Sequence, residues 1–249
     1  MTTPRQLEEL YRQGQNISAF LRKEQGVEHN TREIIEVSYD LQTGSYVAAM
    51  QDEKIARLKE EYSREIASII LALCEPNSIL QAGVGEATTL SGVLQNIPDD
   101  IRAYGFDLSW SRVAYAKRWL GSKGLTNTLL CSGDLFNIPF LDNSVDVVYT
   151  SHSIEPNGGN EEPILRELYR VTRKFLILLE PAYELASDEA RKRMDSHGYC
   201  KNLKGISDQL GYNVLQHKLF PYFANPLNPT ALTIIQKNND ADLPSSIFA

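Results

Sequence analysis

The sequence has no long hydrophobic run, and its first residues lack the apolar segment of a secretion signal. A helix that spans a membrane needs about 20 consecutive, predominantly apolar residues. No stretch of this chain approaches that length. We therefore expect a cytoplasmic protein without a membrane span.

The chain also has little positive charge and few cysteines. Lys and Arg number 25 against 32 Asp and Glu, which gives a net charge of −7. Proteins that bind nucleic acids usually carry a basic excess, so this balance argues against a nucleic-acid partner. Cys74, Cys131 and Cys200 show neither the spacing of a metal site nor that of a disulfide framework. We expect no metal and a reducing compartment.

What is present is an alternation of strand-like and helix-like segments from residue 78 onward. It predicts an α/β fold, here a Rossmann-like, seven-stranded, mainly parallel sheet. The prolines of the segment 221–229 (PYFANPLNP) exclude a crossover helix, so the last strand is expected to run antiparallel. The predicted strands are 78–81, 102–106, 128–131, 145–150, 175–179, 213–219 and 230–236.

Three regions follow from these patterns. Residues 1–60 place apolar side chains at helical spacing and are predicted to form a helical cap or lid. Residues 61–238 are predicted to form the main domain, and residues 239–249 are predicted to form a loose polar tail. The apolar end of that tail leaves open whether the chain belongs to a longer protein, and the oligomeric state is open as well.

The most informative motif is a glycine turn in the segment ILQAGVGEATTL (79–90). Gly83 and Gly85 permit backbone angles and a close approach to a ligand that a Cβ atom would block. The next strand ends at Asp107, where a carboxylate can accept hydrogen bonds from two ribose hydroxyls. The pair indicates a nucleoside-binding site. The alternatives are a turn that serves packing and a carboxylate that caps the following helix.

A second carboxylate follows the third predicted strand, in CSGDLFNIPF (131–140). Asp134 can accept from an adenine amino group there, while Leu135 and Ile138 flank the ring. The alternative is an Asp that only caps a turn.

In this order the motifs resemble the class I S-adenosylmethionine-dependent methyltransferases, especially the small-molecule "type 11" kind, from Ser78 to Glu180. The acidic-x-Gly-x-Gly-x-Gly motif of that family aligns with residues 81–87. Gln81 replaces the acid, and Ala87 replaces the third glycine at the expense of one methyl group. The resemblance implies S-adenosylmethionine as cofactor, with Asp107 at the ribose and Asp134 with Leu135 at the adenine. The expected cofactor-binding residues are Gln81, Gly83, Gly85, Asp107, Leu108, Asp134, Leu135, Ser151, Tyr39 and Tyr46.

Two further features of the sequence bear on the ligand. Glu86 would repel the pyrophosphate of a dinucleotide, whereas a sulfonium cofactor has no phosphate, which favours S-adenosylmethionine over NAD. In the cap, SYDLQTGSYV (38–47) is rich in polar and aromatic groups. Tyr39 and Tyr46 are expected either to close over the cofactor or to anchor the cap helices against the sheet.

The candidate catalytic residues follow the fourth predicted strand. Transfer from a sulfonium mainly requires alignment and exclusion of water, but a hydroxyl acceptor also needs a base. His152 is the first candidate for that base, with Glu155 as the second and a purely structural His152 as the alternative. Glu180, Tyr183 and His197 are expected to contact the acceptor.

These residues predict methyl transfer to oxygen or nitrogen of a small metabolite or of a sugar- or lipid-linked acceptor. Nucleic-acid amino methyltransferases have Asn/Asp-Pro-Pro-aromatic after the fourth strand, whereas residues 150–153 are Thr-Ser-His-Ser. The Leu-Glu-His element common in relatives is Ile154-Glu155-Pro156 here, which weakens a transfer of substrate class. The alternatives are a methyltransferase of protein or tRNA, and a non-catalytic relative that binds the cofactor or a partner.

Overall fold

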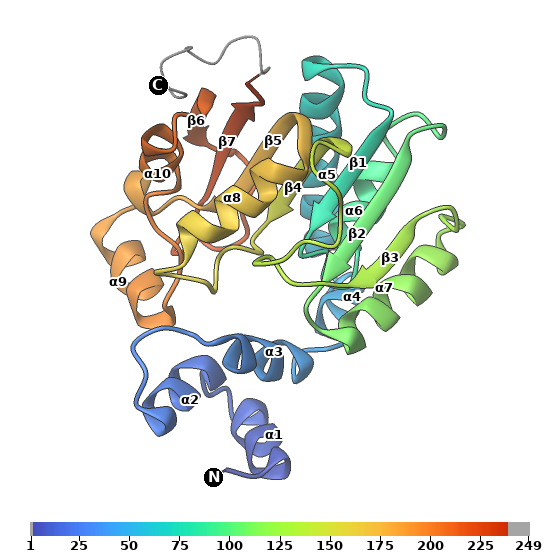
Figure 1. Cartoon of the computed structure of the whole chain (residues 1–249). Helices are drawn as coiled ribbons and strands as arrows, with labels where there is room; N and C mark the ends of the chain where they lie inside the picture. Colours follow the sequence, from blue (N-terminus) through green and yellow to red (C-terminus); the bar gives the residue numbers. More distant parts are fainter. Residues whose placement is uncertain (1, 239–249) are drawn as a thin grey trace.

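The computed structural model describes residues 2–238, so the predicted tail lies outside the described residues. Seven strands form one sheet in the order β3-β2-β1-β4-β5-β7-β6 (Figure 1). The strands are β1 (Ser78–Ala82), β2 (Arg102–Asp107), β3 (Leu129–Ser132), β4 (Val145–Ser151), β5 (Thr172–Pro181), β6 (Asn213–Leu219) and β7 (Thr230–Gln236).

Strands β1 to β5 pair in parallel, and β7 lies antiparallel between β5 and β6. The predicted Rossmann-like sheet with its antiparallel last strand is therefore confirmed. The register aligns Asp107 at the end of β2 with Ser132 at the end of β3, and Ser151 at the end of β4 with Leu179 in β5. Parallel pairing thus brings the carboxyl ends of these strands to one edge, where open α/β sheets bind their ligands.

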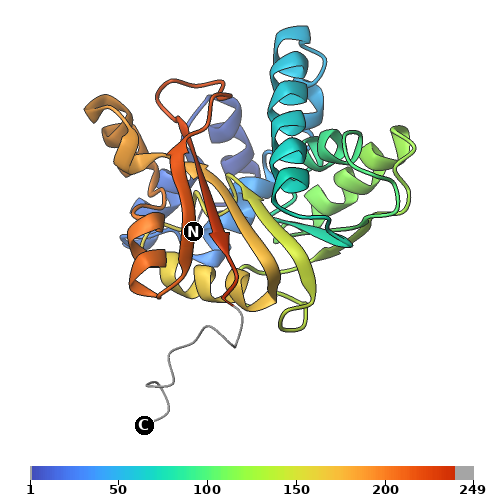
Figure 2. The ribbon, with the colours of Figure 1, turned by 90° about the horizontal axis from the view of Figure 1, so that it is seen from above.

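Successive residues of the buried strands pack into two cores on opposite faces of the sheet, as the period of two requires. Ile79 and Val147 belong to the core under α5 (Glu53–Leu73), α6 (Thr88–Leu94) and α7 (Trp110–Ser122). Leu80 and Val148 belong to the other core, under α8 (Glu161–Val171) and α10 (Leu203–Gln209). Figure 2 shows helices on both faces of the sheet.

The N-terminal cap consists of α1 (Pro4–Arg12), α2 (Ile17–Gln25), α3 (Arg32–Asp40) and α4 (Ser45–Ala49). The first three helices have a small core of their own, which includes Leu7, Leu21 and Ile34. In Figure 1 they lie as a separate layer below the sheet. Helix α5 runs without interruption through residue 60, the predicted end of the cap, and its residues Tyr62 and Ile66 belong to the main core.

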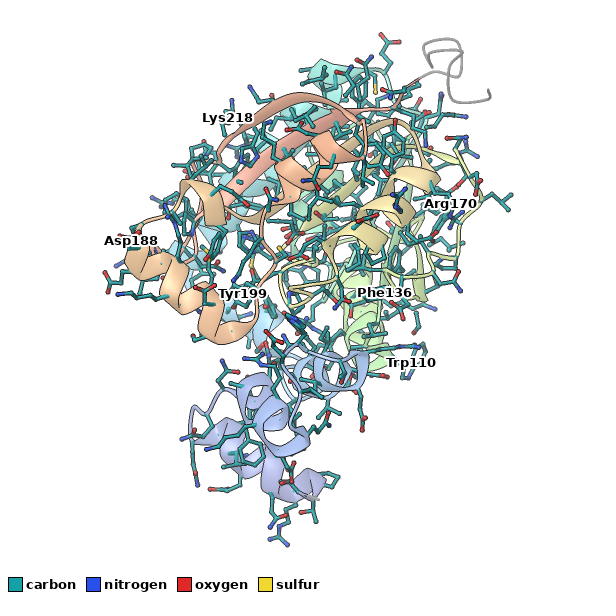
Figure 3. The ribbon with its side chains drawn as sticks, turned by 60° about the vertical axis from the view of Figure 1, so that its left-hand side comes forward. Trp110, Phe136, Arg170, Asp188, Tyr199 and Lys218 are labelled. Atoms are coloured by element: carbon teal, nitrogen blue, oxygen red, sulfur yellow. The ribbon has the colours of Figure 1, made fainter. Side chains whose placement is uncertain are left out.

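A short insertion between β5 and α10 meets the cap. It contains a 3-10 turn, η1 (Tyr183–Leu185), and α9 (Asp188–His197). Arg22 of α2 donates hydrogen bonds to the carbonyl oxygens of Ser196 and His197 at the end of α9, at 2.8 and 3.0 Å. Figure 3 shows the cap extending from this side, near Tyr199, to the side of Phe136 and Trp110.

Within residues 2–238, no helix is both long enough and apolar enough to cross a membrane. The same residues contain no group of three or more His, Cys, Asp or Glu side chains arranged to hold a metal ion. The three cysteines are free thiols.

Candidate functional site

A cavity of about 470 Å³ lies where the carboxyl ends of the strands meet the cap. It is bounded by the glycine turn, by the ends of β2 and β4, by the loop before β7, and by α3, α4 and α5. All ten residues expected to bind the cofactor line it, as do both candidates for the base. These are Gln81, Gly83, Gly85, Asp107, Leu108, Asp134, Leu135, Ser151, Tyr39, Tyr46, His152 and Glu155.

The glycine turn contains three residues with positive φ angles, of which Gly83 and Gly85 line the cavity. Gly83 has φ 71°, and a Cβ atom there would lie 2.1 Å from Cβ of Ser153 in the turn after β4. Glycine is therefore required at this position by contact as well as by angle. Ala87, at the third glycine of the family motif, has φ 58°. The expectation that alanine costs only the space of a methyl group was incomplete, because an alanine in this region also costs about 1 kcal/mol of backbone strain.

Asp107 is held by the backbone on both sides. Its Oδ2 accepts a hydrogen bond from the Gly85 amide at 2.8 Å, and its Oδ1 accepts from the Ser109 amide at 3.0 Å. Burial raises the pKa of Asp107, although Arg112 and the two amides act in the opposite direction. The helix cap of α7 is Ser109, whose hydroxyl accepts from the Arg112 amide at 3.2 Å. Asp107 therefore does not serve as that cap and keeps lone pairs for a ligand at the cavity wall.

Asp134 is oriented by a turn and by the cap. Its Oδ1 accepts from the Phe136 amide at 3.0 Å, and its Oδ2 lies 3.2 Å from Nε of Arg32 in α3. An adenine amino group at this carboxylate would share it with the arginine. Leu135 and Phe136 line the cavity beside it.

Glu86 connects the glycine turn to the cap. Its two oxygens accept hydrogen bonds from the Gly44 and Val47 amides, at 2.9 and 2.8 Å, where α4 begins. Its Oε1 lies 3.9 Å from Nε of Arg112, and the Glu86 side chain is fully buried. The carboxylate that argued against a pyrophosphate thus has a definite role, because it fixes the cap over the turn.

Arg112 in turn lies between the two aromatic residues of the cap. The centre of its guanidinium is 5.0 Å from the Tyr39 ring centroid and 4.5 Å from that of Tyr46. Asp40 accepts hydrogen bonds from the hydroxyls of Ser109 and Ser111, at 2.5 and 2.6 Å. Both expectations for the tyrosines are compatible with this arrangement, since Tyr39 and Tyr46 anchor the cap and also line the cavity.

His152 follows β4 with a φ angle of 54°. Its Nδ1 pairs with the Glu155 carboxylate, and its Nε2 lies 2.8 Å from the hydroxyl of Thr230 at the start of β7. Burial lowers the pKa of His152, but the Glu155 carboxylate outweighs burial and the net shift is upward. Burial raises the pKa of Glu155, but His152 outweighs it and the net shift is downward. Asn228 also donates to Glu155, at 3.2 Å.

The residues expected to contact the acceptor lie elsewhere. Glu180 is buried behind the His152 turn, where its oxygens accept from the Ser153 and Glu155 amides at 3.0 Å each. Burial raises the pKa of Glu180 to about 7. Tyr183 donates to Asp195 at 3.3 Å, and Nδ1 of His197 lies 2.9 Å from the Arg193 carbonyl oxygen. Within residues 2–238, none of these three is part of the cavity wall.

Several cavity residues were not anticipated from the sequence. Arg32, Lys59 and Arg112 supply positive charge from α3, α5 and α7, and Asn228 and Thr230 reach the site from the β7 end. Lys59 and Tyr62 are three positions apart on α5, a helical spacing that places them on one face. That spacing was the only local signal for these two residues in the sequence. Many pairs of exposed residues on helices have the same spacing.

The geometry fits S-adenosylmethionine. A carboxylate at the end of β2 suits ribose hydroxyls, and the glycine turn leaves room where a Cβ atom would stand. Gln81 accepts from the Tyr149 hydroxyl through its amide oxygen, at 3.1 Å, which holds the side chain at the cavity wall.

Comparison with known proteins agrees with the fold. Residues 79–174 match a family described as a methyltransferase domain. Magnesium protoporphyrin IX methyltransferase from Synechocystis PCC 6803, solved with bound SAH, is 12% identical, with 84% of this chain and 100% of that chain covered and a TM-score of 0.63. A geranyl diphosphate methyltransferase in complex with GPP and sinefungin is 11% identical, with 70% and 77% covered and a TM-score of 0.55.

A SAM-dependent methyltransferase from Aquifex aeolicus is 18% identical, with 65% of this chain and 82% of that chain covered and a TM-score of 0.52. The resemblance noted in the sequence is thereby confirmed. Residues 79–174 match a methyltransferase-domain family, and the chain has the fold of the class I S-adenosylmethionine-dependent methyltransferases.

Proposed function

We propose that this protein transfers the methyl group of S-adenosylmethionine to an oxygen or nitrogen atom of a small metabolite or of a sugar- or lipid-linked acceptor. One observation carries the proposal. The glycine turn, Asp107 and the His152–Glu155 pair all line the same cavity. A nucleoside-binding end and a proton-accepting end would thus share one cavity beneath the cap.

The bound cofactor supplies a methyl group already activated on a positively charged sulfur, so the protein mainly has to align the reactants and exclude water. Asp107 would accept hydrogen bonds from the ribose, and Asp134 with Leu135 would hold the adenine. Leu108 and Gln81 would contact the remaining cofactor, with Ser151 at the end of β4. Tyr39 and Tyr46 would exclude water from above.

His152 would accept the proton of the acceptor. Glu155 at Nδ1 fixes the tautomer that leaves Nε2 as the accepting nitrogen. Nε2 already faces the hydroxyl of Thr230, a residue of the cavity wall. An acceptor hydroxyl would either replace the Thr230 hydroxyl or pass its proton through it. Glu180 would act through the backbone amides of residues 153 and 155, which it orients.

The support for a small acceptor is the size of the cavity, about 470 Å³, within the range of small-molecule sites. The net charge of −7 gives no support for a nucleic-acid partner. We also propose a cytoplasmic location, for which the free cysteines are the support.

Two measurements test the proposal. Titration calorimetry with S-adenosylhomocysteine should give a dissociation constant in the micromolar range or below, and the absence of heat well above that range would favour a non-catalytic relative. Incubation with S-adenosylmethionine labelled on the methyl group and a size-fractionated cell extract should place the label in the low-mass fraction. Label confined to protein or RNA would instead favour a macromolecular acceptor.

A further inference from the structure

Lys59 is a cation at the cavity wall whose role the proposed function leaves unassigned. It lies on α5, half-buried, and its Nζ donates a hydrogen bond to the Thr89 hydroxyl at 2.8 Å. The same nitrogen lies 5.1 Å from the centroid of the Tyr62 ring. Burial lowers the pKa of Lys59 to about 8, so the ammonium form still predominates at neutral pH.

The other two cations of the cavity wall are paired with carboxylates, and Lys59 is not. Arg32 lies 3.2 Å from Asp134, and Arg112 lies 3.9 Å from Glu86. Among residues 2–238, no carboxylate is within ion-pair distance of Lys59, and its contacts are a hydroxyl and an aromatic face. A half-buried cation without a counter-ion has lost part of its hydration, and a ligand that supplies negative charge would offset that cost.

The position of Lys59 limits which ligand group can reach it. Thr89 belongs to the first turn of α6, directly after the glycine turn. Tyr62 shares a hydrogen bond of 2.9 Å with Ser151 at the end of β4, and the charge of Lys59 acts to lower the pKa of His152. Lys59 therefore lies between the helix that follows the glycine turn and the His152 side of the cavity, and its printed contacts include neither Asp107 nor Asp134.

We propose that the ammonium group of Lys59 binds a carboxylate or phosphate group of a ligand held in this cavity, at the junction between the cofactor turn and the acceptor end. The inference rests on the proposed function and deepens it. The anionic group has two possible sources, which are the amino-acid carboxylate of the cofactor and an acidic group of the acceptor. In either case a charge-assisted hydrogen bond forms at Nζ and no covalent bond changes.

The test uses the full chain with Lys59→Met, which keeps the length of the side chain and removes the charge. Lys59→Arg is the conservative variant, and Lys54→Met, exposed on the same helix, is the matched control. Calorimetry compares S-adenosylhomocysteine, which has the carboxylate, with 5′-methylthioadenosine, which lacks the whole amino-acid part. Thermal unfolding of each variant verifies that it is folded.

If the cofactor is the source, Lys59→Met weakens S-adenosylhomocysteine binding about tenfold or more and leaves 5′-methylthioadenosine binding unchanged. Lys59→Arg recovers most of the loss, and Lys54→Met has no effect. If the acceptor is the source, both nucleosides bind Lys59→Met as they bind the wild type. Inorganic phosphate then raises the Tm of the S-adenosylhomocysteine-saturated wild type and of Lys59→Arg, but not that of Lys59→Met.

The inference is overturned if Lys59→Met retains both wild-type S-adenosylhomocysteine affinity and a wild-type response to phosphate, including no response in either protein. A failure of the proposed function looks different, because the wild type itself would then bind neither nucleoside.

Discussion

The two ends of the cavity are built in different ways. At the proposed adenosine end, Asp107 and Asp134 are oriented by backbone amides, those of Gly85, Ser109 and Phe136. At the proposed acceptor end, His152 is oriented by side chains, among them Thr230, which is 78 residues away in the sequence. A carboxylate held by amides depends on the shape of a turn. The orientation of an imidazole held by a carboxylate and a hydroxyl depends on both partners, and so does its pKa.

The largest expected effect is a loss of cofactor affinity at Asp107, which is oriented by backbone amides. Asp107→Ala should lower the affinity for S-adenosylhomocysteine about 1,000-fold, because two hydrogen bonds to a charged acceptor contribute about 1.5–3 kcal/mol each. Calorimetry measures the affinity, and thermal unfolding measures the stability lost with the Gly85 and Ser109 contacts. Asp142→Ala, exposed in a loop, is the control. Near-normal binding by Asp107→Ala would remove this residue from the ribose site.

The second largest effect is expected at His152, which is oriented by side chains. His152→Asn should reduce kcat about 100-fold, the lower range for loss of a general base. Asparagine tolerates the positive φ at this position better than most residues, so the turn should persist. The affinity for S-adenosylhomocysteine should stay within about twofold of wild type, a change well below 1 kcal/mol.

Comparison of these two variants shows whether the two ends of the cavity have separate roles. Equal loss of cofactor binding in Asp107→Ala and His152→Asn would show that the two ends are a single unit. Unchanged kcat in His152→Asn would assign His152 a structural role alone.

A smaller effect is expected in the pH profile of Glu155→Gln. The Glu155 carboxylate raises the pKa of His152 against the lowering effect of burial. A base must be neutral to accept a proton, so activity rises as the pH increases through that raised pKa. Glu155→Gln removes the negative charge, and the acid limb of kcat/KM should move to lower pH.

Glu36→Gln removes a carboxylate that lines the same cavity from α3 and should leave the limb in place. An acid limb that does not move in Glu155→Gln would mean that another group titrates in it.

The smallest effect is expected at Gln81, where the family has an acid. Gln81 holds the Tyr149 hydroxyl through its amide oxygen, and a carboxylate oxygen can accept the same bond. Gln81→Glu should therefore change S-adenosylhomocysteine affinity by less than about tenfold, measured by calorimetry. A larger change would show that the neutral side chain is itself a requirement of this site.

The contacts at the amide-held end follow from local sequence patterns, whereas those at the other end do not. A glycine turn followed by a strand that ends in a carboxylate is a local pattern, and the parallel pairing of β1 with β2 brings Gly85 and Asp107 together. The contact of His152 with Thr230 depends on β7 inserting between β5 and β6, which brings residue 230 to the end of β4. No local pattern encodes that contact.

The same reasoning explains why Glu180, which was expected to contact the acceptor, lies outside the cavity wall. Glu180 is a carboxylate at a strand end, like Asp107, and the sequence does not distinguish the two. In the structure, Glu180 faces the backbone of the His152 turn, whereas Asp107 lies at the cavity wall. Lys59 and Arg112 lie on helices whose cavity faces are set by tertiary packing, and their positions could not be inferred before the packing was known.

The contact between Glu86 and the Gly44 and Val47 amides has a practical consequence. A shortened protein that begins at α5 would keep every strand and the glycine turn. It would also leave a buried carboxylate without its two amide donors and expose the tyrosine-covered guanidinium of Arg112. We therefore expect the helices that precede the sheet to contribute to the stability of the whole chain.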